Sequence, residues 1–154
     1  LGYRVTFSPD GKSLAAARTD GSVMLWRLGS PQPILFKGHT ERVRAIAFST
    51  DGTRMATGGQ DNTVRLWNAQ TGNELKTFGQ ADDVQRITFS PDGNRLVTGA
   101  QDGAVKIWDV KSGHQLMTLH KHNAPVTSIA FSSDGKRLAT CAADGVIRLW
   151  QINN

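Results

Sequence analysis

The sequence predicts an all-β protein assembled from four copies of one four-stranded antiparallel unit. The phrase Phe-Ser-x-Asp-Gly recurs at spacings of 41, 41 and 42 residues, beginning at Phe7, Phe48, Phe89 and Phe131. Two further residue types recur in the same register, namely Trp26, Trp67, Trp108 and Trp150, and Asp20, Asp61, Asp102 and Asp144. A repeat of this length is typical of an array whose units cannot bury their apolar faces alone and therefore stack on one another.

Within a unit the apolar residues alternate with polar ones at a period of two, as in half-buried strands. In the second unit this pattern predicts strands over 43–49, 54–58, 63–67 and 74–78. The first two are joined by Thr50-Asp51-Gly52, where glycine accepts a positive φ, and Asp61-Asn62 is typical of a two-residue hairpin. No stretch is typical of a helix, and the units are expected at 1–37, 43–78, 84–120 and 126–152.

Composition excludes several classes of protein. The 154 residues include 38% hydrophobic ones, enough for a core, but no uninterrupted apolar stretch exceeds four residues, so a transmembrane span is excluded. The single cysteine, Cys141, makes no internal disulfide and rules out a Cys-rich zinc site. No signal-peptide pattern is visible, so we expect a cytoplasmic protein, and the start at Leu1 suggests a trimmed or partial product. The net charge of +5 permits an anionic partner without requiring one.

The repeated phrases Val-Arg-Leu-Trp, Ser-Pro-Asp-Gly and Gly-His-x-x-x-Val resemble those of the WD-repeat (WD40) β-propeller family along the whole chain. Only Trp108-Asp109 shows the dipeptide that gives the family its name. The resemblance implies four consecutive propeller blades, of which the last lacks its outer strand. Since such rings usually have seven blades, it also implies the C-terminal part of a larger propeller or, alternatively, two copies that close an eight-bladed ring through sticky open edges. The regular Phe-Ser-Pro-Asp-Gly phrasing looks more like bacterial members than animal ones.

A set of residues in the repeats imitates a catalytic triad. In the second unit it consists of His39, Thr57, Asp61 and Trp67, and in the fourth of His122, Thr140, Asp144 and Trp150, with His and Asp 22 residues apart in both. The third unit keeps Thr98, Asp102 and Trp108 but has Gln80 in place of His, and the first has Ala16 in place of Thr. An enzyme needs one complete active site, whereas this set of residues recurs in the repeats and has individual members replaced in two of them. We therefore interpret it as a buried chain of hydrogen bonds from Trp through Thr and His to Asp, which is what the family resemblance implies.

The family implies a non-catalytic platform for protein–protein interaction, the scaffold or sensor part of a larger protein, with no cofactor or metal. Alternatives are a basic surface for anions or nucleic acid and, less favoured, an enzyme with its site in the propeller channel. Partners of the family most often dock on the face formed by the loop before the inner strand and the aspartate turn. The corresponding residues here are Tyr3, Thr19, Arg42, Arg44, Gln60, Asp83, Gln85, Gln101, Pro125, Thr127 and Ala143. Among them, Arg42 and Arg44 are expected to be exposed charges that jointly meet a carboxylate or phosphate.

Overall fold

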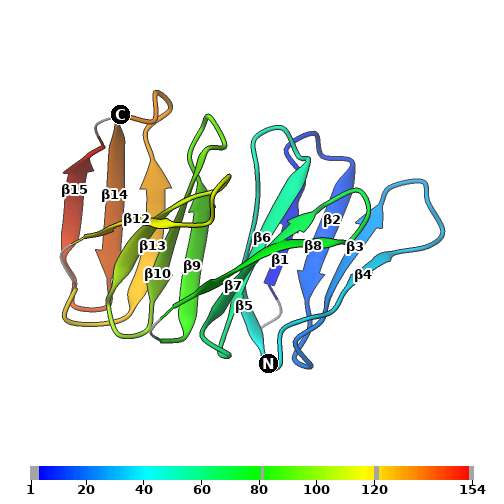
Figure 1. Ribbon diagram of the computed structural model, residues 1–154, viewed down its shortest axis with the longest axis horizontal. Coiled ribbons are helices and arrows are strands. Elements are labelled where there is room, and N and C mark those ends of the chain that lie inside the picture. Colours follow the sequence, from blue (N-terminus) through cyan, green and yellow to red (C-terminus); the bar gives the residue numbers. More distant parts are fainter. Residues whose placement is uncertain (1–3, 81, 120–121, 153–154) are drawn as a thin grey trace.

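The strands form because apolar and polar residues alternate along them, which gives each sheet two faces that neighbouring sheets can bury. The computed structural model describes residues 4–80, 82–119 and 122–152. Within these residues, fifteen strands form four antiparallel sheets that stand side by side (Figure 1). We number these sheets blades 1 to 4 in chain order.

Each blade is a meander whose consecutive strands are hydrogen-bonded neighbours. Blade 1 consists of β1 (Arg4–Phe7), β2 (Ser13–Ala17), β3 (Val23–Arg27) and β4 (Ile34–Phe36). Blade 2 consists of β5 (Val43–Phe48), β6 (Arg54–Gly59), β7 (Thr63–Asn68) and β8 (Glu74–Gly79). Blade 3 consists of β9 (Val84–Phe89), β10 (Arg95–Ala100), β11 (Val105–Asp109) and β12 (Gln115–Leu119). Blade 4 consists of β13 (Val126–Phe131), β14 (Arg137–Ala142) and β15 (Ile147–Gln151).

The all-β prediction is confirmed, and the described residues of the last unit form three strands, without an outer one. The described part of blade 4 is a sheet of three strands, whereas the other three blades have four each. The inner strands follow one another around the array, since β1 contacts β5, β5 contacts β9, and β9 contacts β13. The blades are therefore stacked in chain order.

The turn between the first two strands of each blade is built by a serine and an aspartate. In blade 2 the hydroxyl of Ser49 donates to Oδ1 of Asp51 at 2.6 Å, and the same oxygen accepts the N–H of Thr53 at 3.0 Å. Gly52 completes the turn with a φ of 67°, which side chains resist. The hydroxyl–carboxylate bond recurs between Ser8 and Asp10, Ser90 and Asp92, and Ser132 and Asp134. The repeated phrase thus specifies one repeated turn.

Apolar side chains fill the three joints between successive blades. At the second joint, Val64 and Leu66 of blade 2 belong to one buried cluster with Ile87, Phe89 and Trp108 of blade 3. Corresponding positions form the clusters of the first and third joints. At each joint, branched side chains of the third strand of one blade share a cluster with the inner-strand phenylalanine and the repeat tryptophan of the next blade.

The second joint leaves no space for a side chain at Gly58 on β6. A Cβ atom added to Gly58 would lie 2.4 Å from Cγ1 of Val84, whereas one added to Gly79 would have nothing within 4 Å. We expect Gly58→Ala to lower the free energy of unfolding by about 1–3 kcal/mol through overpacking. The matched variant Gly79→Ala should leave it nearly unchanged. Urea unfolding measures both, and equal midpoints for the two variants would contradict this account of the joint.

Candidate functional site

The predicted partner face lies where the loop before each inner strand meets the turn that carries the repeat aspartate. The N–H of Gln60 donates to the carbonyl of Arg42 at 2.9 Å, which holds the two segments together in blade 2. The same backbone bond recurs between Gln101 and Asp83 at 2.8 Å, and between Ala143 and Pro125 at 2.9 Å. The structure thus brings six of the predicted residues together as three pairs, one in each of blades 2 to 4.

The remaining predicted residues fall into two groups. Thr19 is exposed on the corresponding turn of blade 1, and Tyr3 lies outside the described residues. Arg44, Gln85 and Thr127 are the extra residues of β-bulges, because the pairing of each inner strand with its neighbour skips them. A bulge re-aims a side chain and is over-represented beside functional sites. The sequence pattern predicted the position of these residues but not the bulges.

Arg44 is not the simple exposed charge that the sequence suggested. Its Nε lies 2.7 Å from Oδ2 of Asp83, and the two side chains are 32% and 13% exposed. The contact is ionic, since Arg44 Nε has no hydrogen bond of good geometry. Burial raises the pKa of Asp83, and the charge of Arg44 opposes that rise. This pair joins the inner strand of blade 2 to the loop before β9, so it links two blades within the candidate face.

Two arginines of the inner strands reach the next blade through its bulge. Nε of Arg4 donates to the carbonyl of Arg44 at 2.9 Å, and Nε of Arg86 donates to the carbonyl of Thr127 at 2.5 Å. Burial lowers the pKa of Arg86, and the positive charge of Arg4 lowers it further. The carbonyls of two bulged residues therefore accept hydrogen bonds that link one inner strand to the next. Sequence reasoning missed these contacts, because nothing in the repeat marks the bulged carbonyls.

In blade 2 the triad-like residues form one continuous chain of hydrogen bonds. The indole N–H of Trp67 donates to Oγ1 of Thr57 at 2.8 Å, and Nε2 of His39 lies 2.7 Å from the same oxygen. Nδ1 of His39 lies 2.9 Å from Oδ2 of Asp61. Because a carboxylate only accepts, Nδ1–H donates to Asp61, and Nε2 accepts the hydroxyl of Thr57. The hydroxyl that would serve as nucleophile is fully buried, so no substrate reaches it.

Blades 3 and 4 hold weaker versions of this chain. In blade 4, Trp150 and His122 both bond Thr140, at 3.0 and 2.8 Å, but Nδ1 of His122 is 3.6 Å from Asp144. That Nδ1 is buried without a hydrogen bond. Blade 2 therefore has the complete network, and blade 4 an incomplete one.

Blade 3 shows what the replacement of histidine by glutamine changes. The indole of Trp108 donates to Thr98 at 3.0 Å, and the hydroxyl of Thr98 donates to Oε1 of Gln80 at 3.3 Å. Nε2 of Gln80 is buried without a hydrogen-bond partner. Asp102 holds its own turn by accepting the N–H of Ala104 at 3.0 Å. The Trp–Thr half of the network thus persists where the histidine is missing.

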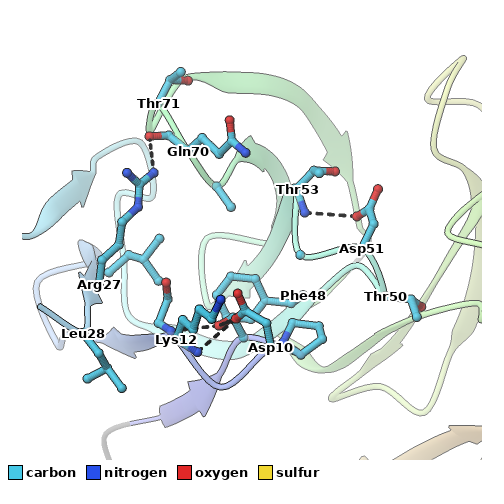
Figure 2. A pocket seen from close by; sticks show the side chains of 16 residues that line it. Asp10, Lys12, Arg27, Leu28, Phe48, Thr50, Asp51, Thr53, Gln70 and Thr71 are labelled. Atoms are coloured by element: carbon cyan, nitrogen blue, oxygen red, sulfur yellow. Dashed lines mark hydrogen bonds between the residues drawn. The ribbon is translucent and has the colours of Figure 1, made fainter. Parts of the chain in front are cut away.

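A hollow of about 700 Å³ lies between blades 1 and 2 on the opposite face (Figure 2). Arg27 reaches across it and donates to the carbonyl of Gln70 at 2.8 Å. Asp51 accepts the N–H of Thr53, as drawn in Figure 2, and the serine hydroxyl of its own turn lowers its pKa. This carboxylate serves its turn, as does that of Asp10. The hollow therefore does not present the raised-pKa carboxylate of a general acid.

The described residues hold neither a cluster of three metal-ligating side chains nor a helix that is long and apolar enough to cross a membrane. His120, which the sequence places two residues before His122, lies outside them. Cys141 is a free, partly buried thiol on β14.

Residues 3–27, 30–68, 72–109 and 113–151 match the family model for the WD domain, G-beta repeat (WD40). Each match ends one residue after a repeat tryptophan, so its boundaries follow the internal repeat. No curated protein sequence matches the chain.

The contribution of the histidine contact is measurable by comparing two repeat aspartates. Asp61 and Asp20 both accept from the residue two positions on, but only Asp61 also bonds a buried histidine. We expect Asp61→Ala to lower the free energy of unfolding by about 1–3 kcal/mol more than Asp20→Ala does, because it strands His39. Chemical denaturation checks this difference. An Asp61→Ala variant that melts like the parent and loses a hydrolase activity would refute the structural role.

The same network predicts a dependence of stability on pH. Burial lowers the pKa of His39, and the hydrogen bond to Asp61 only partly opposes this. The unfolded chain therefore binds a proton at His39 at higher pH than the folded chain does. Stability should fall as the pH drops below the ordinary histidine pKa of 6.5.

Asp61 adds a second step at lower pH. Burial tends to raise its pKa, but the bonds from His39 and Thr63 outweigh this and lower it. Stability from this carboxylate is thus present above the ordinary value of 3.8 and lost below it. Urea unfolding from pH 7 to pH 3 measures both steps. In His39→Gln the decline just below pH 6.5 should become shallower, and an unchanged profile would contradict the assignment.

Proposed function

Because the chain belongs to the WD40 repeat family, whose domains generally mediate contacts between proteins without catalysing reactions, we propose that it is a non-catalytic interaction module. In this proposal it is the scaffold or sensor part of a larger protein. Its partners are other proteins, the remaining blades of the same propeller, or a second copy joined through the open blade edges. A cytoplasmic location and a bacterial source belong to the same proposal.

The observation that carries the proposal is the grouping of variable residues at one end of the blades. The backbone bond from Gln60 to Arg42 and its two counterparts give blades 2 to 4 the same loop frame. On that common frame, the bulged position holds a different side chain in each of these three blades, namely Arg44, Gln85 or Thr127. A fixed frame with different side chains supports recognition of an irregular protein surface, and arginine is enriched among the residues that dominate binding energy.

The enzyme alternative gains no support from the best candidate chemistry. The His39–Thr57 pair has the composition of an activated nucleophile, yet Thr57 is fully buried and receives a hydrogen bond from Trp67. The anion alternative has one observation in its favour, namely that Arg4 and Arg86 lie near enough for one charge to lower the pKa of the other. Both guanidiniums already donate to carbonyls of the neighbouring blade, which is a structural use of them.

The proposed face is testable by comparing two sets of arginines. We expect the double variant Arg42→Ala, Arg44→Ala to weaken capture of protein partners from a bacterial lysate by about 2 kcal/mol, or roughly 30-fold. The control removes Arg54, Arg95 and Arg137, which lie at the opposite end of the strands, and it should retain the captured proteins. Quantitative mass spectrometry of the retained proteins measures both.

Loss of the ion pair needs its own control. Because Arg44 neutralises the partly buried Asp83, the double variant is paired with Asp83→Asn, which removes the partner charge while keeping Arg44. Similar unfolding midpoints for these variants keep a loss of binding separate from a loss of structure. Capture that survives the double variant but fails in the control triple variant would move the site to the opposite face.

A further inference from the structure

The ion pair between Arg44 and Asp83 uses only one edge of the arginine. A guanidinium group has an Nε edge and an edge formed by its two Nη atoms. Nε of Arg44 lies 2.7 Å from Oδ2 of Asp83. Of the three guanidinium nitrogens only Nε is buried, and neither Nη atom bonds a described residue. The Nη edge of Arg44 is therefore open to solvent on the candidate face.

The loop before β9 holds the Asp83 carboxylate in place beside Arg44. The pair lies at the second joint, between blades 2 and 3, each of which contacts a neighbouring blade on both sides. The N–H of Gln101 donates to the carbonyl of Asp83 at 2.8 Å, and the N–H of Asp83 donates to Oδ1 of Asp82 at 2.8 Å. These two bonds fix the backbone that carries the carboxylate.

The negative charge of this loop makes the Nη edge of Arg44 a poor site for a further anion. Burial raises the pKa of Asp83 and the charge of Asp82 raises it further, while the charge of Arg44 opposes both. Arg44 thus compensates a carboxylate that water solvates poorly. A second carboxylate at the Nη edge would share this one positive charge with Asp83, and like charges so close together disfavour each other.

Uncharged acceptors meet no such repulsion, and the neighbouring arginines show how this face uses them. Nε of Arg4 donates to the carbonyl of Arg44 at 2.9 Å. Arg86 donates to two carbonyls, from Nε to Thr127 at 2.5 Å and from Nη1 to Gln85 at 2.6 Å. Guanidinium groups on the inner strands therefore already bind main-chain carbonyl oxygens.

We propose that Asp83 sets the specificity of the candidate face. By neutralising Arg44, it selects against acidic partner segments and leaves the Nη edge to the main-chain carbonyls of an extended, uncharged segment. This inference rests on the proposed function, because it names the kind of segment that the interaction face takes. It differs from the sequence-based expectation, in which Arg44 meets a carboxylate or phosphate of the partner.

Two matched peptides test the proposal. One is a decapeptide that alternates glutamate with glycine, and the other has glutamine in place of each glutamate. NMR titration of the isotopically labelled chain at about 50 mM salt gives both dissociation constants, and the Nε–H signal of Arg44 reports binding at the site. In Asp83→Asn the acidic decapeptide should bind at least about 5-fold more tightly than to the unmodified chain. The uncharged decapeptide should change by less than about 2-fold.

Two further variants separate the role of Asp83 from a general effect of net charge. Glu41→Gln removes the same charge from an exposed residue of the loop before β5, and it should raise the affinity for the acidic decapeptide by less than about 2-fold. In the double variant Asp83→Asn, Arg44→Ala the gain should disappear. Asp83→Ser replaces Asp83→Asn if circular dichroism shows that the latter does not fold.

An Asp83→Asn chain without the gain would overturn the proposal. An equal gain in Glu41→Gln, or a gain that persists without Arg44, would overturn it as well. If partner capture requires Arg42 and Arg44 but Asp83→Asn gains nothing, the interaction face stands and the role of Asp83 is wrong. If Asp83→Asn gains affinity through Arg44 but partner capture survives the double arginine variant, the role of Asp83 stands and the proposed partner site is wrong.

Discussion

The burial of each blade against the next is the interaction on which the rest of the structure depends. A four-stranded sheet has two faces, and within one blade nothing can cover both of them. The joints solve this by placing Val64 and Leu66 of one blade against Ile87 and Phe89 of the next, in a contact repeated three times. The loops of the candidate face connect strands of these packed blades. The packing at the joints therefore sets the positions of the loops relative to one another.

The polar network and the apolar joints meet at the repeat tryptophan. Trp67 donates its indole N–H into the chain of Thr57, His39 and Asp61, while its ring packs edge-on against Phe36 of the preceding blade. One side chain thus ties the hydrogen bonds within a blade to the packing between blades. The network also reaches the loops, because Asp61 accepts the N–H of Thr40 beside the histidine. Specific buried polar contacts therefore fix the loop frame that the apolar joints alone would leave loosely defined.

The sequence was sufficient to predict the features that recur in every repeat. It was insufficient to predict the contacts between one repeat and the next. Strand order, the serine–aspartate turns and the spacing of His39 and Asp61 all follow from local patterns that recur in register. The ion pair of Arg44 and Asp83 was missed because it joins two blades, and no pattern within one repeat specifies it. The contrast between His39, at 2.9 Å from its aspartate, and His122, at 3.6 Å, is also invisible in two motifs of equal spacing.

In a repeat array the packing constraints differ between positions, and these constraints determine which residues are free to vary. A residue inside a joint contacts two blades at once. A methyl group at Gly58 therefore has no room, and Trp67 takes part both in the hydrogen bonds within its blade and in the packing against the preceding blade. At the bulges, the carbonyls of Arg44 and Thr127 accept hydrogen bonds from Arg4 and Arg86 of the preceding inner strand, and the Arg44 side chain additionally pairs with Asp83. A carbonyl is the same whatever the side chain. At Thr127 the bulge keeps the link between blades through the backbone while the side chain stays exposed, so this side chain can change without loosening the stack.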